Sequence, residues 1–172
     1  LSPTGAQPMM SHDQRFVICY NGEVYNLSDL KQKLPAINWR GHSDTEVILA
    51  GYQCWGENIQ KKLNGMWAFA IHDLKKNEVF LSRDRFGIKP IYYLKDKNRI
   101  AFASEMKAFM FLKDKLRPNF DDNILINLRI HDSIEKTFLQ NVFSLPPGCS
   151  IKIKDKKFSL KKWWNLKNNL IK

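Results

Sequence analysis

The sequence predicts a single α+β domain in which antiparallel strands are interleaved with short helices. A chain of 172 residues with 44% hydrophobic content can bury one substantial core, but it is short for two typical domains. Apolar runs of strand length occur in pairs that short polar turns separate, which is typical of hairpins. Helical patterns lie between these pairs and do not alternate with single strands, so β-α-β repeats are not indicated.

The first predicted elements are a strand and a helix. Residues 15–20 form a short apolar run that ends at the dipeptide Asn21-Gly22, which predicts a strand entering a tight turn. Residues 27–34 carry leucines at helical spacing. Asn26 is available as the cap of this helix, and Pro35 ends it.

A second helix is predicted from its capping signals. Ser43 and Glu46 match the S-x-x-E capping box, which places the start of the helix at Asp44. Apolar residues continue the pattern through Tyr52, and Gly56 is suited to close it. The two helices therefore follow the first strand directly.

The middle of the chain predicts antiparallel strands. Residues 66–73 are apolar on both faces, which suits a central strand covered on both sides. The polar residues 75–77 reverse the chain, and residues 78–82 return as the next strand. Residues 91–94 and 100–103 predict a further hairpin.

The last third predicts two short helices and a final hairpin. Ser104 caps a helix that runs to Leu112, and residues 122–130 predict another. The hairpin combines residues 151–153 and 158–160. We expect residues 1–150 to form the globular domain and residues 151–172 to form a hairpin with a Lys-rich tail.

Charge and composition exclude several classes of protein. The net charge is +11, but residues 151–172 hold eight lysines and one acidic residue, so the basicity belongs mainly to the tail. With no aromatic-basic recognition motif, nucleic-acid binding is not predicted. No apolar run reaches membrane-spanning length, and the first residues lack the charged and apolar regions expected of a secretory signal. Three cysteines without paired spacing indicate a reduced, cytoplasmic compartment.

Two short polar segments could form a pocket for an amino acid. The Asn21 side chain and the Gly22 backbone N–H could stabilise an oxyanion, because glycine allows a ligand close to the backbone. Glu23 and Asp44 could hold an ammonium group. Structural interpretations stay open: Asn-Gly is a common hairpin turn, Asp44 suits a helix N-terminus, and Glu23 could be solvated.

A wider pattern supports the pocket, because six segments in order resemble the glutamine amidotransferase domain of glutamine-hydrolysing asparagine synthetases. They are S-P-T-G-A-Q-P-M (2–9), N-G-E-V-Y-N (21–26), S-D-T-E-V-I-L (43–49), L-N-G-M-W-A-F-A (63–70), R-D-R-F-G-I-K-P (83–90) and F-A-S-E-M-K-A (102–108). The L-P-P-G segment (145–148) and Trp164 resemble the end of the same domain.

This resemblance implies a class II amidotransferase with the N-terminal-nucleophile (Ntn) hydrolase fold. That fold is a four-layer αββα sandwich of two antiparallel sheets, here expected without its first strand. In the family, an N-terminal cysteine attacks the side-chain amide of L-glutamine, with its own amino group as the base. By motif match, Asn21 and Gly22 would stabilise the oxyanion, while Glu23 and Asp44 would bind the substrate amino group.

The resemblance also implies partners outside this chain. Ammonia would pass to a synthetase domain, where ATP and Mg²⁺ activate aspartate, and members of the family are commonly homodimers. The chain has no S-G-G-x-D-S phosphate loop, begins at Leu1 and lacks the family's arginine-bearing segment. We therefore expect a domain truncated at both ends and inactive without its nucleophile; the acceptor substrate stays open.

The thiols and imidazoles predict no second catalytic centre. Cys19, Cys54 and Cys149 are each interpreted as small buried hydrophobic residues. The four histidines have no metal-ligand spacing, so no metal is expected. The segment Arg83-Asp84-Arg85 could be a phosphate site, although a structural loop is the favoured interpretation.

Two other hypotheses for the function of the chain stay open beside a catalytically active amidotransferase. The chain could be a non-hydrolytic relative retained for binding or interdomain signalling, with Trp163 and Trp164 as an interdomain contact. It could also be an unrelated basic binding module, which would bind nucleic acid in a salt-sensitive manner.

Overall fold

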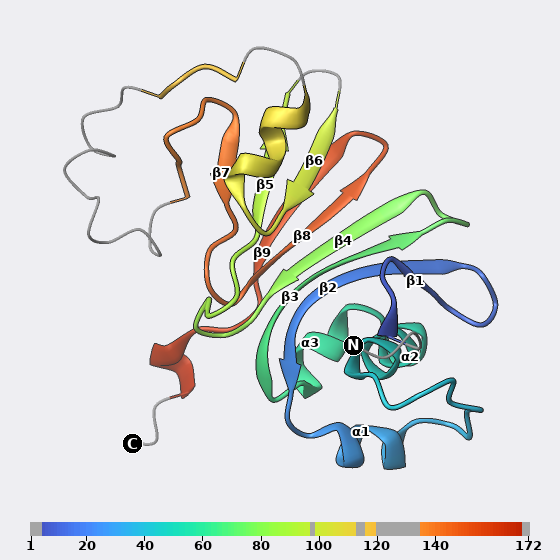
Figure 1. Ribbon diagram of the computed structural model, residues 1–172. Coiled ribbons are helices and arrows are strands. Elements are labelled where there is room, and N and C mark those ends of the chain that lie inside the picture. Colours follow the sequence, from blue (N-terminus) through green and yellow to red (C-terminus); the bar gives the residue numbers. More distant parts are fainter. Residues whose placement is uncertain (1–4, 97–98, 113–115, 120–134, 170–172) are drawn as a thin grey trace.

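Two antiparallel sheets form the centre of the molecule. The computed structural model describes residues 5–96, 99–112, 116–119 and 135–169. The larger sheet has six strands in the order β1-β2-β3-β4-β8-β9, and the smaller has three in the order β6-β5-β7. Helices α1, α2 and α3 gather on one side of the larger sheet, and the smaller sheet lies toward its other side (Figure 1).

The larger sheet consists of β1 (Met9–Met10), β2 (Phe16–Val24), β3 (Gly65–Asp73), β4 (Glu78–Arg83), β8 (Cys149–Lys154) and β9 (Lys157–Lys162). The smaller sheet consists of β5 (Tyr92–Lys95), β6 (Ile100–Ala103) and β7 (Val142–Ser144). The α-helices are α1 (Leu27–Lys33), α2 (Asp44–Trp55) and α3 (Ile59–Lys62). The 3₁₀ helices are η2 (Gly56–Asn58), η3 (Met106–Leu112) and η5 (Leu166–Asn169).

Strand β3 is covered on both faces, as its apolar pattern predicted. Trp67, Phe69 and Ile71 belong to the core beneath the helices. Ala68 and Ala70 belong to the core between the two sheets. The large side chains fill the helix side and contribute on the order of 2–3 kcal/mol each. The small alanines let the second sheet pack closely.

The turn predicted at Asn21-Gly22 is wrong, because β2 continues through both residues. Asn21 pairs with Ala68 and Gly22 with Trp67 in the β2–β3 ladder. A Cβ at Gly22 would lie 2.3 Å from the Met66 carbonyl oxygen. The glycine thus permits the close approach of two strands, and pairing along all of β2 overrides the local turn preference.

The predicted helix over residues 27–34 is confirmed as α1, and Asn26 stands at its N-cap position without capping it through its side chain. The Asn26 side chain makes no capping hydrogen bond. Its amide donates to the Lys62 carbonyl (3.0 Å), and its oxygen accepts from the Asn64 N–H (2.9 Å). Asn26 therefore ties the start of α1 to the segment that leads into β3.

Helix α2 begins at Asp44 as predicted, and only half of its predicted capping box forms. The Ser43 hydroxyl accepts from the Thr45 N–H at 3.2 Å, and Gly56 ends the helix with a positive φ of 57°. The Glu46 carboxylate instead accepts from the N–H groups of Arg40 and Gly41. Because these loop N–H groups donate to it, the Glu46 carboxylate does not accept from the backbone at the start of the helix.

Other predicted elements are adjusted by the structure. The helix predicted from Ser104 to Leu112 is the 3₁₀ helix η3, and the helix predicted over 122–130 lies outside the described residues. The final hairpin is present, but the division expected at residue 150 falls within β8. Since β8 pairs with β4, this hairpin continues the larger sheet. Among the described residues, no helix has the length and apolar character needed to span a membrane.

The burial predicted for the cysteines is right only for Cys149. Cys19 and Cys54 are exposed. Cys19 pairs with Ala70 and so lies on the face of β2 toward the second sheet. The described core between the sheets draws on β3, β4 and β8 from the larger sheet, and it does not reach Cys19.

Candidate functional site

A cavity of about 800 Å³ lies where β2 meets the start of α2. Three segments line it: residues 5–7, 20–22 and 42–45. Its volume is within the range of small-molecule sites. The structure therefore brings Asn21, Gly22 and Asp44 to one cavity, while the exposed Glu23 is not among its lining residues.

Asp44 is held in place by one of its two carboxylate oxygens. Its Oδ2 accepts from the Tyr20 hydroxyl at 2.7 Å and from the Val24 N–H at 3.3 Å. Its Oδ1 accepts no hydrogen bond from the described residues and is available to a ligand. A fixed carboxylate with an open oxygen suits an ammonium group.

Gly22 presents an N–H on the same edge of β2 that has no partner among the described residues. Alternate N–H groups of a strand point to the same side. The Tyr20 N–H donates to the Gln7 Oε1 at 2.5 Å, and the Val24 N–H donates to Asp44, so this edge faces away from β3. Gly22 lies between Tyr20 and Val24. The neighbouring strand β1 pairs only with Val17 and Ile18, so it does not cover this part of β2. Its N–H is therefore open to a ligand's oxygen.

Asn21 adds a second group to this part of the cavity. The Asn21 side chain makes no hydrogen bond to the described residues, although it lines the cavity. Its amide can donate two hydrogen bonds. An amide donor beside a free backbone N–H is the arrangement that stabilises an oxyanion.

Tyr20 is a site residue that the sequence did not indicate. Burial raises the pKa of its hydroxyl far above the usual value, and the hydrogen bond to Asp44 and the charges of Asp44 and Glu23 raise it further. Tyr20 therefore stays protonated and donates to Asp44. In the sequence it was the end of an apolar run, and its partner lies 24 residues away.

The Tyr20→Phe substitution should weaken the binding of L-glutamine, the ligand that the family resemblance implies, about three- to tenfold, because Asp44 loses the donor that fixes its orientation. Calorimetric titration of both proteins with L-glutamine measures this change. A purely structural role would lower the melting temperature and leave the affinity unchanged, and that result would contradict the assignment of Tyr20 as a positioning residue.

Glu46 supports the wall of the cavity from behind. Its side chain is only 4% exposed. Its Oε1 accepts from the Arg40 N–H (3.1 Å) and the His12 Nε2 (3.2 Å), and its Oε2 accepts from the Gly41 N–H (3.3 Å). These bonds fix residues 40 and 41, which directly precede the cavity-lining segment that begins at His42.

The Glu46 carboxylate is held in its charged form. Burial would raise its pKa, but hydrogen bonds from Arg40, His12 and Gly41 outweigh burial, and the net pKa is lowered. The unfolded chain therefore takes up this proton at a higher pH than the folded chain. The stabilisation is complete above about pH 4.3 and is lost as the pH falls through the lower pKa of the folded state.

The Glu46→Gln substitution should lower the free energy of unfolding by about 1–3 kcal/mol near neutral pH, because charge-assisted hydrogen bonds are lost. Urea unfolding of both proteins at several pH values measures the difference, which should shrink below about pH 4. Glu57→Gln is the control, since Glu57 makes an exposed ion pair with Lys152. A difference that does not change with pH would contradict this role of Glu46.

The segment Arg83-Asp84 is structural. The buried Asp84 carboxylate accepts from four backbone N–H groups, those of Trp67, Phe86, Ile88 and Lys89, at 3.0–3.2 Å. Arg83 donates to the carbonyl oxygens of Gly87, Lys89 and Leu145. Both side chains are used by the surrounding backbone, so the structural interpretation of this loop is confirmed for these two residues.

A metal site is not formed by the part of the chain that the structure describes. None of the described His, Cys, Asp and Glu residues form a group of three that could hold an ion.

Comparison with known proteins places the chain in a family. The family model described as a glutamine amidotransferase domain matches residues 1–164. The chain is similar to asparagine synthetase [glutamine-hydrolyzing] 3 of Bacillus subtilis, with 39% identity over 84% of this chain and 22% of the relative. It is also similar to putative asparagine synthetase [glutamine-hydrolyzing] 2 of Methanocaldococcus jannaschii, with 48% identity over 57% of this chain and 19% of the relative.

Solved structures show the same fold. Glutamine phosphoribosylpyrophosphate amidotransferase from B. subtilis, complexed with ADP and GMP, matches 95% of this chain and 33% of its own, with a TM-score of 0.68 and 20% identity. The predicted Ntn-hydrolase arrangement of two antiparallel sheets is confirmed. The chain spans about a fifth of the length of the curated relatives named above. By the family match over nearly its whole length, the chain belongs to the glutamine amidotransferase domain family.

Proposed function

We propose that the cavity binds L-glutamine and that, within a longer protein, this domain releases the amide nitrogen as ammonia for the ATP-dependent amidation of aspartate. The observation that carries the proposal is the pair of open groups on one cavity: the Asp44 Oδ1 and the Gly22 N–H. The first suits the α-ammonium group of an amino acid, and the second suits its side-chain carbonyl.

Each predicted site residue has a role in this proposal. Asp44 binds the substrate ammonium, while Gly22 and Asn21 stabilise the oxyanion formed when the amide carbon is attacked. Glu23 acts at the edge of the cavity, where its charge adds to that of Asp44 near Tyr20.

The attacking thiol is proposed to come from outside the described cavity. Hydrolysis requires a thiolate to attack the amide carbon, ammonia to leave with a proton, and water to cleave the resulting thioester to give glutamate. Cys19, Cys54 and Cys149 are not among the cavity-lining residues. Burial also raises the pKa of the Cys19 and Cys149 thiols, which disfavours their thiolates.

The wider assembly follows the named relatives. We propose a synthetase domain as the partner that receives ammonia, with ATP and Mg²⁺ bound there and not in this domain. A cytoplasmic location and a homodimeric parent belong to the same proposal. A non-hydrolytic binding or signalling domain that uses the same cavity is the second candidate.

Calorimetry on the 172-residue polypeptide tests the proposal. L-Glutamine should bind with a dissociation constant on the order of 1 mM or below. D-Glutamine should bind more weakly, because its ammonium and amide groups cannot both meet Asp44 and Gly22. Equal binding of both enantiomers would contradict the assigned pocket. An ammonia assay on the same sample should show no release, and release would point to one of the three thiols.

A further inference from the structure

The first turn of α2 borders the candidate glutamine cavity and has the features of an anion site. Helix α2 has 12 residues and begins at Asp44, and residues 43–45 line the cavity. The first N–H groups of an α-helix have no intrahelical acceptor, and the helix dipole places a partial positive charge at this end. Such a helix end favours a carboxylate or another anion as its neighbour.

Thr45 carries a buried hydroxyl group that has no partner among the described residues. The residue is only 2% exposed, and its backbone N–H donates to the Ser43 Oγ at 3.2 Å. Its own hydroxyl makes no hydrogen bond to the part of the chain that the structure describes. A buried hydroxyl without a partner costs free energy, so this group indicates a ligand.

The Thr45 hydroxyl is accessible from the cavity. Among the described residues, the side-chain N and O atoms that are fully inaccessible and lack a partner are the Nε1 atoms of Trp67 and Trp163. The Thr45 oxygen also lacks a partner but is not one of these atoms, so it touches accessible space. Because Thr45 is a lining residue, that space is the cavity.

The three segments around the cavity are in contact with one another. The Tyr20 hydroxyl donates to the Asp44 Oδ2 at 2.7 Å, and the Tyr20 N–H donates to the Gln7 Oε1 at 2.5 Å. A Cβ added at Gly5 would lie 3.8 Å from the Ser43 Oγ, so the first lining segment reaches the start of α2. These contacts bound the space in front of the first turn of α2.

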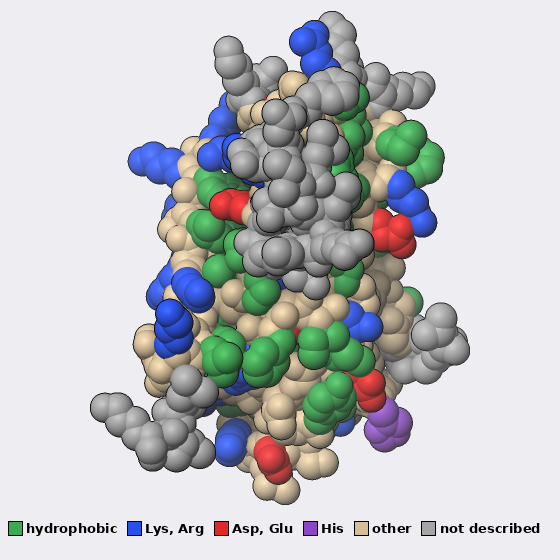
Figure 2. All heavy atoms as spheres, turned by 90° about the vertical axis from the view of Figure 1, so that its left-hand side faces the viewer, with side chains coloured by type: hydrophobic (Ala, Val, Ile, Leu, Met, Phe, Trp, Pro, Cys, Tyr) green, Lys and Arg blue, Asp and Glu red, His purple; other side chains and the backbone are tan. Residues whose placement is uncertain are grey.

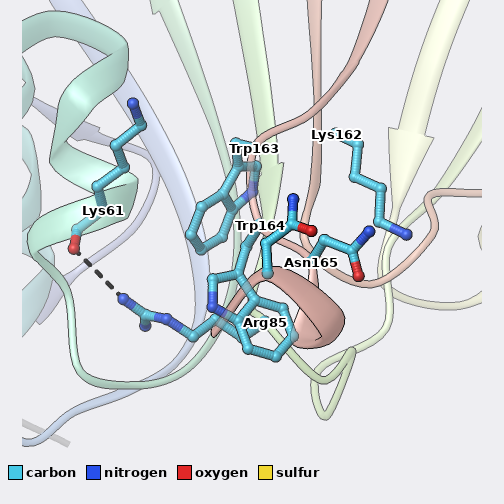
Figure 3. A pocket seen from close by; sticks show the side chains of 7 residues that line it. Lys61, Arg85, Lys162, Trp163, Trp164 and Asn165 are labelled. Atoms are coloured by element: carbon cyan, nitrogen blue, oxygen red, sulfur yellow. Dashed lines mark hydrogen bonds between the residues drawn. The ribbon is translucent and has the colours of Figure 1, made fainter. Parts of the chain in front are cut away.

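The lysines and arginines of the chain do not explain how this cavity would hold an anion. None of its lining residues is a lysine or an arginine. Figure 2 shows such side chains scattered over one face of the molecule. A second cavity, of about 390 Å³, is lined by Lys61, Arg85 and Lys162, but these side chains do not converge on one point (Figure 3). An anion in the candidate glutamine cavity therefore depends mainly on neutral donors.

His42 and Gln7 also line the cavity, but they differ from Thr45. Both are exposed, so water can satisfy their polar groups when no ligand is bound. The Gln7 Oε1 already accepts from the Tyr20 N–H. Neither residue indicates a ligand in the way that the buried Thr45 hydroxyl does.

We propose that the first turn of α2 binds the α-carboxylate of the amino acid, with the Thr45 hydroxyl and the Asp44 N–H as donors. The α-ammonium and α-carboxylate groups of an amino acid are attached to one carbon atom, so their partners have to be neighbours, as Asp44 and Thr45 are. The site would then prefer free glutamine over glutamine whose carboxyl group is amidated or in a peptide bond. This inference rests on the proposed glutamine site and adds a residue that determines its specificity.

Calorimetric titration of the 172-residue polypeptide with L-glutamine and L-glutaminamide tests the proposal. L-Glutaminamide keeps the amine and the side-chain amide but has an uncharged amide in place of the carboxylate, and at about pH 6 both amines are protonated. The wild type should bind L-glutamine about tenfold more tightly than L-glutaminamide. Thr45→Val should weaken L-glutamine binding about five- to tenfold and L-glutaminamide binding less than about twofold, because the lost donor serves the carboxylate.

Thr45→Ser is the matched control, since it keeps the hydroxyl and should bind L-glutamine within about twofold of wild type. Equal weakening of both ligands by Thr45→Val, or equal affinity of the wild type for both ligands, would overturn this inference and leave the glutamine site in place. Loss of the preference in His42→Gln but not in Thr45→Val would overturn it in favour of His42. A wild-type protein that does not bind L-glutamine would contradict the proposed function and this inference with it.

Discussion

The Asp44→Asn substitution should weaken L-glutamine binding by about ten- to a hundredfold, the largest functional effect expected from a single change in this chain. The substitution removes the charge that faces the substrate ammonium, and charge-assisted hydrogen bonds contribute about 1.5–3 kcal/mol. The protein should remain folded, because the hydroxyl of Ser43 still caps α2. Isothermal titration calorimetry at constant salt measures the change.

Asp29→Asn is the matched control for this experiment. Asp29 also lies in the first turn of a helix, in α1, but it does not line the cavity. Its loss should leave the glutamine affinity unchanged. An unchanged affinity in Asp44→Asn, or an equal loss in both variants, would remove Asp44 from the site.

The Asp84→Ala substitution should lower the free energy of unfolding by about 3–5 kcal/mol, the largest stability effect expected. Asp84 is fully buried, and its carboxylate accepts from the N–H groups of Trp67, Phe86, Ile88 and Lys89. Removing it leaves the buried Trp67 N–H and three part-buried N–H groups without their acceptor. It also disconnects β3 from the loop that leads toward β5.

Urea unfolding monitored by circular dichroism measures this loss. The control is Glu105→Ala, which removes an exposed carboxylate paired with Lys107 and should cost less than about 1 kcal/mol. A similar small cost for Asp84→Ala would show that water or other groups replace the carboxylate, and the structural account of the loop would then be wrong.

Periodicity predicted the centre of the fold well because burial dominates there. Residues 66–73 are apolar on both faces, and the structure covers both faces of β3. The turn predicted at Asn21-Gly22 was wrong because burial does not decide the structure there. A local turn preference was outweighed by the pairing of β2 with β3, a contact between residues more than forty positions apart.

The candidate site was predicted only in part. Asn21, Gly22 and Asp44 meet at one cavity, as their motifs implied. Tyr20 and Glu46 were missed as supporting residues because their partners are set by the tertiary fold. The capping-box pattern predicted that Glu46 would cap the start of α2. In the structure, its carboxylate accepts from the N–H groups of Arg40 and Gly41 in the preceding loop. A spacing rule cannot weigh such competing donors.

The cysteines show the limit of composition as a guide to burial. Cys19 lies within an apolar run and was expected in the core, but it is exposed in the structure. Burial of a strand face depends on what packs against it. The described core between the sheets includes residues of β3, β4 and β8 and stops short of β2.

A crystal structure of the 172-residue polypeptide with L-glutamine would test the central claim most directly. We predict the α-ammonium group within hydrogen-bond distance of the Asp44 Oδ1, and the side-chain carbonyl facing the Gly22 N–H and the Asn21 amide. Glutamine bound elsewhere, or bound here with its carboxylate toward Asn21 and its amide toward Asp44, would contradict the account.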